Sequence, residues 1–392
     1  MYISILGRQP EISLAELEKV FGDKNIRLAS DEAVIINQSK TPDISQLGGS
    51  IKIGRIIDEI SFNKDWNKSI KYLVDYYIKE WGEADHKITL GLSLYGEDRS
   101  ERDIQKIGIL IKQGLKKKNI SLRLIPNKTK ALSSAVSHHN KLGLSLNKVE
   151  LIILRAKSNE IIVAQSIGAQ NITAYAKRDQ GRPKRDAFVG MLPPKLAQIM
   201  INLAIGNTKN KTKKAILDPF CGTGVLLQEA ALMGFDVIGT DISQKMIDYS
   251  EENLKWLEKK YDINISKSLN IGDATEIRWT KMIDAVISET YLGQPFSAPP
   301  SDDKLNEIKR NCSRIILNFL QNLHSQIESG TPICIAVPAW INKDGKLIRL
   351  QVDSSINNMG YNMDRFKNIS KPLIYRRENQ IVARELLVFK KV

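Results

Sequence analysis

The fold of this chain is decided by the stretch Ile216-Leu217-Asp218-Pro219-Phe220-Cys221-Gly222-Thr223-Gly224. A short apolar run ends there in an acidic residue, a glycine-rich turn follows, and a helical pattern begins at Val225. Strand, tight turn and helix in this order are typical of the first unit of a doubly wound α/β sheet. Glycines at 222 and 224 predict that the backbone approaches a ligand closely, because a Cβ atom there would be strained or in the way.

A second acidic residue follows the next expected strand. Residues 235–240 have a strand pattern, and Asp241 comes directly after them, where its carboxylate is well placed to accept hydrogen bonds from a ribose diol. The turn at 218–224 is not the dinucleotide-binding fingerprint and lacks the Gly-Lys-Ser/Thr of a phosphate-binding loop. The plain alternative is an ordinary strand-turn-helix with incidental glycines, and the two carboxylates disfavour it.

The turn at 218–224 resembles the nucleoside-binding turn of Rossmann-like S-adenosylmethionine methyltransferases, in the form that nucleic-acid methylases use. The resemblance implies a seven-stranded α/β sheet whose last strand is antiparallel. We expect its strands at 214–218, 235–240, 263–268, 283–288, 331–337, 361–368 and 381–390. It also implies S-adenosylmethionine as the cofactor, bound at the carboxyl ends of the strands. The residues expected to bind it are Pro193, Lys195, Asp218, Phe220, Gly222, Thr223, Gly224, Asp241, Ile242, Asp273 and Ala274.

The fourth of these strands leads into Ser288-Glu289-Thr290-Tyr291. Amino-methylating members of the family carry Asp or Asn, two prolines and an aromatic residue in that turn. Oxygen atoms there accept the hydrogens of an exocyclic amine while the ring stacks on the base, which raises electron density on the nitrogen. We expect Ser288 to accept a hydrogen bond, Glu289 to accept one or act as the base, and Tyr291 to stack. The departure from the family's pattern leaves open which atom is methylated.

Composition points to a globular protein of two or three compact units, with 392 residues of which 42% are hydrophobic and 26% charged. The cysteines at 221, 312 and 334 have no metal-ligand spacing and read as buried thiols in a reducing compartment, so we expect no metal site. No apolar run is long enough to span a bilayer, and the first residues lack the charged start of a signal peptide. We therefore expect a cytoplasmic protein with no membrane partner.

Positive charge is concentrated in one part of the chain. The formal net charge is +14, and +13 of it falls in residues 101–185. Self-repulsion destabilises a compact domain, so such a concentration favours a polyanionic partner over a merely solvated surface. The residues expected to contact RNA phosphates are Lys112, Lys116, Lys117, Lys118, Arg123, Lys128, Lys130, Arg178 and Arg182.

A wider resemblance covers almost the entire chain. It is carried by the methylase turns, an N-terminal α+β pattern, Leu132-Ser133-Ser134-Ala135, Asn140 and Tyr175-Ala176-Lys177-Arg178-Asp179. Together these residues resemble the THUMP-domain tRNA guanosine-10 N2-methyltransferases of archaea and eukaryotes. The resemblance implies a ferredoxin-like α+β unit at 1–50, a THUMP RNA-binding domain at 51–169, a linker at 170–190 and a methyltransferase domain at 191–392.

The same resemblance implies methyl transfer to the exocyclic N2 amine of a guanosine in tRNA, and, as in some lineages of the family, a small activating protein partner. Two alternatives stay open. One is an rRNA guanine-N2 methyltransferase on the same scaffold. The other is a non-catalytic RNA-binding protein that retains the S-adenosylmethionine pocket as a relic. A DNA methylase is less expected, because no DNA-recognition motif is evident.

Overall fold

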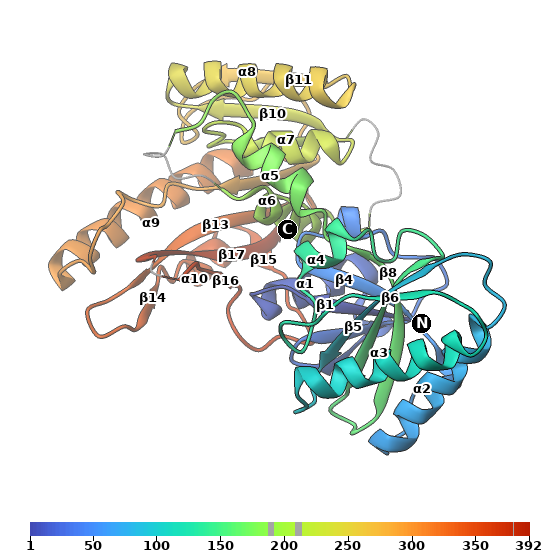
Figure 1. Cartoon of the computed structure of the whole chain (residues 1–392). Helices are drawn as coiled ribbons and strands as arrows, with labels where there is room; N and C mark the ends of the chain where they lie inside the picture. The colour runs from blue at the N-terminus through green and yellow to red at the C-terminus, as the bar shows by residue number, and fades with distance from the viewer. Residues whose placement is uncertain (187–191, 208–213, 379) are drawn as a thin grey trace. The chain divides into compact units, whose positions relative to one another are not determined.

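The computed structural model describes residues 1–186, 192–207, 214–378 and 380–392 (Figure 1). The chain forms two compact units. Unit 1 consists of Met1–Leu14 and Phe21–Ala174, and unit 2 consists of Ala15–Val20 and Tyr175–Val392. Each unit is built on a β-sheet of its own, so the predicted α/β class is confirmed.

Unit 1 contains a sheet of eight strands in the order β2-β3-β1-β4-β8-β7-β5-β6. These strands are β1 (Tyr2–Leu6), β2 (Ile26–Ser30), β3 (Ala33–Ile36), β4 (Ser50–Ile56), β5 (Ile88–Tyr95), β6 (Leu122–Leu124), β7 (Lys148–Arg155) and β8 (Ile161–Ala169). Strand β5 pairs in parallel with β6 and β7, and the other neighbours are antiparallel. The helices are α2 (Trp66–Glu80), α3 (Glu101–Lys116) and α4 (Ser134–His139), with α1 (Pro10–Phe21) divided between the units. Short 3₁₀ turns lie at Asp23–Asn25, Ile44–Gln46 and Asp58–Ile60.

The sheet of unit 1 runs through the predicted domain boundary at position 50. Strand β1 pairs with β4, with Tyr2 opposite Arg55, so strands from residues 1–50 and 51–169 share one sheet. The division of this region into two domains stays a prediction. The predicted linker at 170–190 contains a helix, α5 (Ile172–Gln180).

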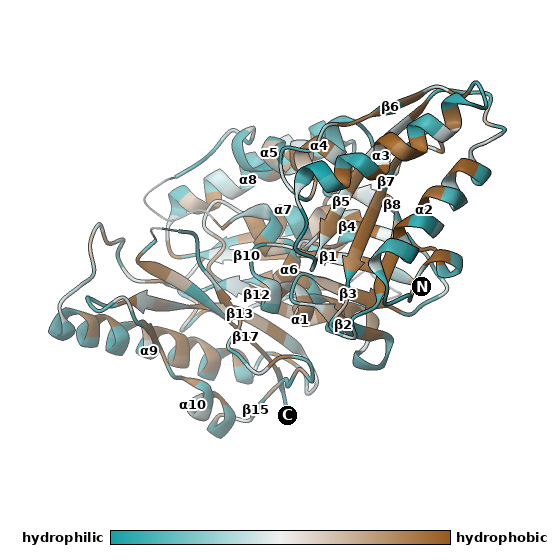
Figure 2. Cartoon of the chain, turned by 60° about the horizontal axis from the view of Figure 1, so that its bottom comes forward, coloured by the Kyte–Doolittle hydropathy of each residue, from teal (hydrophilic) through white to brown (hydrophobic). Residues whose placement is uncertain are grey.

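Helices α2 and α3 pack their apolar faces against β5, β7 and β8. Helix α3 begins at a capping box, in which Ser100 and Asp103 each donate a backbone N–H to the other's side chain. Its buried residues recur at helical spacing, and α3 accordingly alternates between hydrophobic and hydrophilic residues in Figure 2. Gly114 on α3 lets α2 pack closely against α3, because a Cβ atom at this position would lie 2.2 Å from Cδ1 of Ile78 on α2.

A charged pair is buried in the middle of unit 1. Lys52 on β4 and Glu150 on β7 form an ion pair, and neither side chain is exposed to solvent. The Lys52 ammonium also donates to Ser93 Oγ at 3.0 Å and to the carbonyl of Leu132 at 2.6 Å, so its three hydrogens have partners. Burial lowers the pKa of Lys52, although Glu150 opposes this shift.

Unit 2 contains a nine-stranded sheet with the order β11-β10-β9-β12-β13-β17-β15 along its main path, while β14 pairs with β13 and β16 with β17. These strands are β9 (Ala215–Asp218), β10 (Asp236–Asp241), β11 (Lys267–Ile271), β12 (Ala285–Glu289), β13 (Pro332–Ile341), β14 (Leu347–Arg349), β15 (Tyr361–Met363), β16 (Ile374–Tyr375) and β17 (Val382–Lys391). The helices are α6 (Pro194–Ile205), α7 (Val225–Leu232), α8 (Gln244–Tyr261), α9 (Asp302–His324) and α10 (Asp353–Asn358). Strands β9 to β13 are parallel and β17 is antiparallel, which confirms the predicted Rossmann-like sheet with its reversed last strand.

Two expected strands differ from those observed. The strand expected at 263–268 is β11 at Lys267–Ile271, because residue 263 still bonds the end of α8 through the Glu258 carbonyl. The strand expected at 361–368 is only three residues long, since the backbone N–H groups of Lys367 and Asn368 donate to the Glu18 carboxylate instead.

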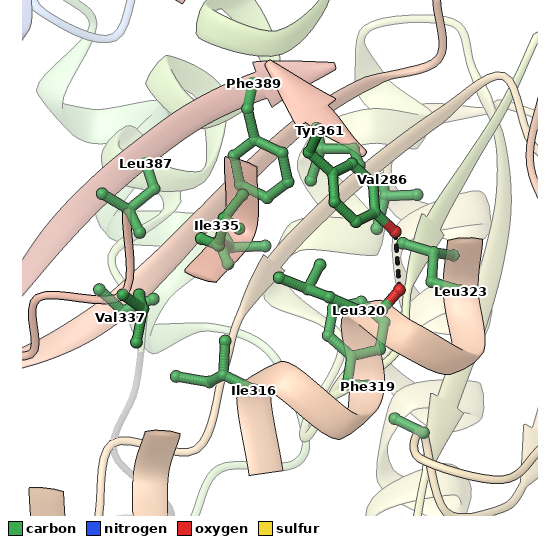
Figure 3. Close-up of a cluster of buried hydrophobic side chains, with 14 of the residues drawn as sticks. Val286, Ile316, Phe319, Leu320, Leu323, Ile335, Val337, Tyr361, Leu387 and Phe389 are labelled. Carbon is green, nitrogen blue, oxygen red and sulfur yellow. Dashed lines mark hydrogen bonds between the residues drawn. The ribbon is translucent and has the colours of Figure 1, made fainter. Parts of the chain in front are cut away.

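The core of unit 2 lies between α9 and the sheet. Figure 3 shows the α9 side chains Ile316, Phe319, Leu320 and Leu323 gathered with side chains of β13, β15 and β17. The Tyr361 hydroxyl donates to the carbonyl of Leu320 at 2.7 Å, which satisfies a polar group inside this apolar cluster. The three cysteines are buried free thiols, as predicted.

Candidate active site

A cavity of about 570 Å³ lies in unit 2 at the carboxyl ends of β9, β10 and β12. This is where parallel α/β sheets bind their ligands. It is lined by Leu192, Asp218, Pro219, Phe220, Cys221, Gly222, Thr223, Val225, Leu226, Asp241, Ile242, Gly272, Asp273, Ala274, Thr275, Glu289, Thr290, Tyr291, Leu292, Gly293, Arg314, Ile315 and Asn318. The turns after four strands and one side of α9 therefore surround a single space.

The glycine turn is held tightly against its neighbours. Gly224 adopts a φ of 77° at the start of α7, and a Cβ atom there would meet Ser250 Oγ at 2.8 Å. The backbone N–H of Gly222 donates to Asp241 Oδ2 at 2.9 Å, and the side chain of Asn253 donates to the carbonyl of Thr223 at 2.8 Å. Gly224 is thus a position where a side chain would not fit, and Gly222 also has a positive φ, of 51°.

Asp241 presents a fixed carboxylate to the cavity. Its Oδ1 accepts the backbone N–H of Ser243 at 2.9 Å, while its Oδ2 holds Gly222. The next residue, Ile242, lines the cavity and leaves 71% of its surface exposed, which is unusual for a large aliphatic residue. A carboxylate beside an uncovered apolar wall suits a nucleoside, whose ribose donates hydrogen bonds and whose base packs on apolar groups.

The turn after β11 completes this side of the cavity. The backbone N–H of Gly272 donates to the carbonyl of Asp241 at 3.0 Å, which joins the two turns. Oδ1 of Asp273 accepts both the backbone N–H and the hydroxyl of Thr275, at 2.8 and 2.7 Å. Ala274 lines the cavity as a small, buried apolar group. The chemistry of these groups, an acidic acceptor beside apolar walls, fits the nucleoside part of S-adenosylmethionine.

Asp218 is almost fully buried at the end of β9, with 3% of its surface exposed. Its Oδ1 accepts the hydroxyl of Ser288 at 2.6 Å and the backbone N–H of Phe220 at 3.3 Å. Burial raises the pKa of Asp218 to about 7, although both hydrogen bonds oppose the shift. The nearby carboxylates of Asp241 and Glu289 add to it. A cationic ligand in the cavity would favour the ionised form.

Three of the expected cofactor contacts, Gly224 in the glycine turn and Pro193 and Lys195 at the start of α6, do not line the cavity. Pro193 is the N-cap residue of α6 and Lys195 lies in its first turn, and neither lines the cavity. Leu192, which was not singled out from the sequence, does line it. A cofactor contact at 193 or 195 stays a prediction.

Ser288 and Glu289 at the end of β12 were expected to act together, but only Glu289 lines the cavity. Ser288 is fully buried, donates its hydroxyl to Asp218 and is not among the residues that line the cavity. Glu289 and Tyr291 do line it, and 42% of the Tyr291 surface is exposed. This follows from strand geometry, because successive side chains point to opposite faces.

Thr290 anchors this turn without the family's prolines. Its backbone N–H and its hydroxyl both donate to the carbonyl of Ala336 on β13, each at 3.0 Å. Two hydrogen bonds to one acceptor fix the backbone between Glu289 and Tyr291. The turn, which lacks the family's prolines, is thus linked directly to the neighbouring strand.

Arg384 is a charged residue beside the cavity that was not among the predicted site residues. It lies on β17, and its Nε forms an ion pair with Glu289 Oε1. Both side chains are largely buried. The sequence offered one signal: Arg384 and Glu385 lie between apolar residues of the predicted last strand, and charges buried in a strand require partners.

The residues expected to contact RNA fall into two groups. Exposed side chains on and after α3 are Lys112, Lys116, Lys117, Lys118, Arg123 and Lys128, and the half-buried Lys130 pairs with Asp98 at 2.7 Å. Arg178, in contrast, donates two hydrogen bonds to the Glu229 carboxylate, at 2.6 and 3.1 Å, and Arg182 is 3% exposed. The latter two lie inside unit 2 and do not present their guanidinium groups to solvent.

Within the described ranges, no cluster of His, Cys, Asp and Glu is arranged to hold a metal ion. The helices that the structure describes include none that is long and apolar enough to cross a membrane.

The strand order and the glycine turn are those of the Rossmann-like methyltransferase fold. The chain belongs to the methylases: a family model described as a DNA methylase matches residues 57–252, half of the chain, and one described as a methyltransferase domain matches residues 210–362. The fold is similar to that of TrmN from Thermus thermophilus, with a TM-score of 0.52, 12% identity and coverage of 100% of this chain and 99% of that one.

Curated relatives of this chain are named tRNA (guanine(10)-N2)-dimethyltransferase. The protein from Methanothermobacter thermautotrophicus is 34% identical over 42% of this chain and 44% of its own length. The one from Pyrococcus abyssi is 34% identical over 29% of this chain and 32% of its own length. The one from Methanocaldococcus jannaschii is 25% identical over 66% of this chain and 72% of its own length. The matched region thus spans less than half of the first two relatives.

Proposed function

We propose that this protein transfers methyl groups from S-adenosylmethionine to the exocyclic N2 amine of a guanosine in tRNA. The observation that carries the proposal is the cavity, in which Asp241 and Ile242 are suited to a nucleoside while Glu289 and Tyr291 line the same space. The names of the curated relatives support the choice of guanine N2 and of tRNA.

When bound, S-adenosylmethionine supplies an activated methyl group, whose bond to sulfur breaks as the amine nitrogen bonds to its carbon. The protein's part is to present the amine. Tyr291, exposed at the cavity, stacks on the extruded base, and Glu289 accepts a hydrogen bond from the amine. The hydrogen bond raises electron density on a nitrogen that conjugation makes a poor nucleophile. The proton that the methylated nitrogen releases passes to the Glu289 carboxylate and then to water.

In this proposal unit 1 binds the RNA. We assign residues 51–169 to a THUMP domain and residues 1–50 to a ferredoxin-like unit, as the sequence resemblance implies. The exposed lysines of α3 and the residues after it offer charge to the phosphate backbone. A cytoplasmic location, where tRNA is abundant, belongs to the same proposal, and so does a small activating protein as a further partner.

Two rival functions predict different products. An rRNA guanine-N2 methyltransferase would use the same cavity on another RNA, and a non-catalytic RNA-binding protein would bind S-adenosylmethionine without transfer. The basic segment and the tRNA-modifying relatives favour tRNA over DNA, although one matching family model is described as a DNA methylase.

The deciding experiment incubates the protein with methyl-labelled S-adenosylmethionine and the total tRNA of its host, with host rRNA and DNA in parallel. Digestion and chromatography then identify the labelled nucleoside. N2-methylguanosine or N2,N2-dimethylguanosine in tRNA is the expected product. Label in rRNA alone would support the first rival, and cofactor binding without transfer, with and without added host extract, would support the second.

A further inference from the structure

The ion pair between Glu289 and Arg384 spans three strands of the unit 2 sheet. Glu289 on β12 is opposite Ala336 on β13, and Ala336 is opposite Leu386 on β17. Residues opposite each other point to the same face of a sheet, and so do residues two apart on one strand. Arg384 therefore lies on the same face as Glu289 and reaches it diagonally past Ala336.

Two residues of β13 lie on this face between the two charged strands, Ala336 opposite Glu289 and Pro338 opposite Arg384. Ala336 carries only a methyl group, and both residues are buried. The pair is also largely dry, with 8% of the Arg384 side chain and 14% of the Glu289 side chain exposed. Partly buried, charge-assisted pairs of this kind restrict a carboxylate far more than solvated ones do.

A second Arg–Glu pair lies on the opposite face of the same strand. Glu385, the residue after Arg384, accepts from Nε of Arg349 at 2.7 Å and is also buried. Neither Arg349 nor Glu385 lines the cavity. The two pairs thus resemble each other in chemistry and position on β17, and only the one at Glu289 adjoins the site.

Ser288, at the position of the family's hydrogen-bond acceptor, makes a different hydrogen bond in this chain. Ser288 gives its hydroxyl hydrogen to Asp218 and is fully buried, so it does not face a target amine. Glu289 supplies the carboxylate of this turn that lines the cavity, one residue further along. Because a side chain this long has several rotamers, it requires a partner that fixes it.

We infer that Arg384 is a positioning residue that holds Glu289 Oε1. The Glu289 carboxylate then accepts a hydrogen bond from the target amine, the role that the family gives to the position of Ser288. This inference rests on the proposed function. In the transfer step the amine nitrogen bonds to the methyl carbon, the carbon–sulfur bond breaks with its electron pair on sulfur, and the nitrogen's proton leaves to Glu289. Other charged groups at the cavity are Asp218, Asp241, Asp273 and Arg314.

The test compares Arg384→Gln, Arg384→Lys and the matched control Arg349→Gln in single-turnover methylation of host tRNA. We expect Arg384→Gln to lower the rate constant at least about 10-fold while the Kd for S-adenosylmethionine stays within about twofold. Arg384→Lys keeps the positive charge without the planar guanidinium, so it should recover part of the rate constant that Arg384→Gln loses.

Arg349→Gln removes the pair between β14 and Glu385 of β17, away from the cavity, and should leave the rate constant unchanged. Equal effects of Arg384→Gln and Arg349→Gln would overturn the inference, because loss of packing on β17 would then explain both. A wild-type protein that methylates no tRNA would overturn the proposed function instead. Crystal structures of the wild type and Arg384→Gln would then decide on the ion pair: a displaced Glu289 carboxylate supports the inference, and an unmoved one contradicts it.

Discussion

Ser288 Oγ donates a hydrogen bond of 2.6 Å to Asp218 Oδ1, which links the ends of two neighbouring parallel strands at the centre of the cofactor site. The backbone N–H of Phe220 donates to the same oxygen. These two bonds do not outweigh the cost of burying a negative charge, and the pKa of Asp218 is accordingly raised to about 7. The ionised carboxylate at this position therefore lowers the stability of the ligand-free protein.

The first prediction concerns Asp218→Asn. In the unfolded chain this carboxyl has a pKa of 3.8, so between about pH 4 and 7 the folded protein holds a proton that the unfolded chain has released. Stability from this group is present below that window and is lost as pH rises through it, by up to about 4 kcal/mol. Asn keeps the one oxygen that accepts both hydrogen bonds and carries no charge. We expect Asp218→Asn to be more stable than the wild type at pH 8 and equally stable near pH 4, measured by urea unfolding.

The same substitution should weaken cofactor binding, since the carboxylate at 218 lines a cavity for a cationic ligand. Calorimetric titration with S-adenosylmethionine at pH 8 measures this directly. Asp236→Asn, at the other end of β10 and away from the cavity, serves as the control. Equal unfolding free energies of Asp218→Asn and the wild type at pH 8 would show that the buried charge costs nothing.

The second prediction concerns Asp241→Ala. Both oxygens of this carboxylate are held by backbone N–H groups, from Gly222 and Ser243, and the residue lines the cavity. Loss of charge-assisted bonds to a ribose diol, at about 1.5–3 kcal/mol, should raise the Kd for S-adenosylmethionine on the order of 10- to 100-fold. Asp236→Ala removes a carboxylate from the same strand and should leave the Kd unchanged. A Kd within error of the wild type would place the ribose elsewhere.

The part of the cavity lining that lies in the turns after β9, β10 and β11 could be predicted because these residues directly follow strand ends. A glycine turn after β9 and an acid after β10 follow from local pattern, and the topology of parallel strands brings them to one edge. The residues Asp218, Asp241 and Asp273 were placed together by that rule, and all three line the cavity.

The target side depends on contacts between residues far apart in the chain. Nothing local in the sequence indicates that Ser288 would bond Asp218, or that Arg384 would reach Glu289 across 95 positions. Both contacts depend on strand order and register, which single-sequence patterns do not specify. Arg178 shows the same limit, because its basic surroundings suggested RNA while its partner, Glu229, lies on a helix 51 residues away.

The third prediction concerns the buried pair in unit 1. Lys52→Met leaves the Glu150 carboxylate without its cation in a site with no solvent exposure. Breaking a buried pair in this way should lower the unfolding free energy by about 3–5 kcal/mol. Urea unfolding measures the loss. Lys157→Met, which breaks the exposed pair with Asp31, is the control and should cost less than about 1 kcal/mol. If Lys52→Met lowered the unfolding free energy as little as the control does, the buried ion pair would contribute nothing to stability.

The fourth prediction tests the RNA surface. The triple substitution of Lys116, Lys117 and Lys118 to Glu reverses three exposed charges at the end of α3. Phosphate contacts release counterions on binding, so their loss should weaken tRNA binding and also reduce the steepness with which affinity falls as salt rises. Filter binding of host tRNA at several salt concentrations measures both.

The matched control reverses Lys255, Lys259 and Lys260, three exposed lysines on α8 of unit 2. The net charge changes equally in the two variants, so a general electrostatic effect would weaken binding equally in both. We expect the α3 variant alone to lose about one unit of salt slope for each phosphate contact removed. An unchanged slope in that variant would exclude residues 116–118 from the interface, whatever happened to the affinity, because slope counts displaced ions whereas affinity also responds to distant charge.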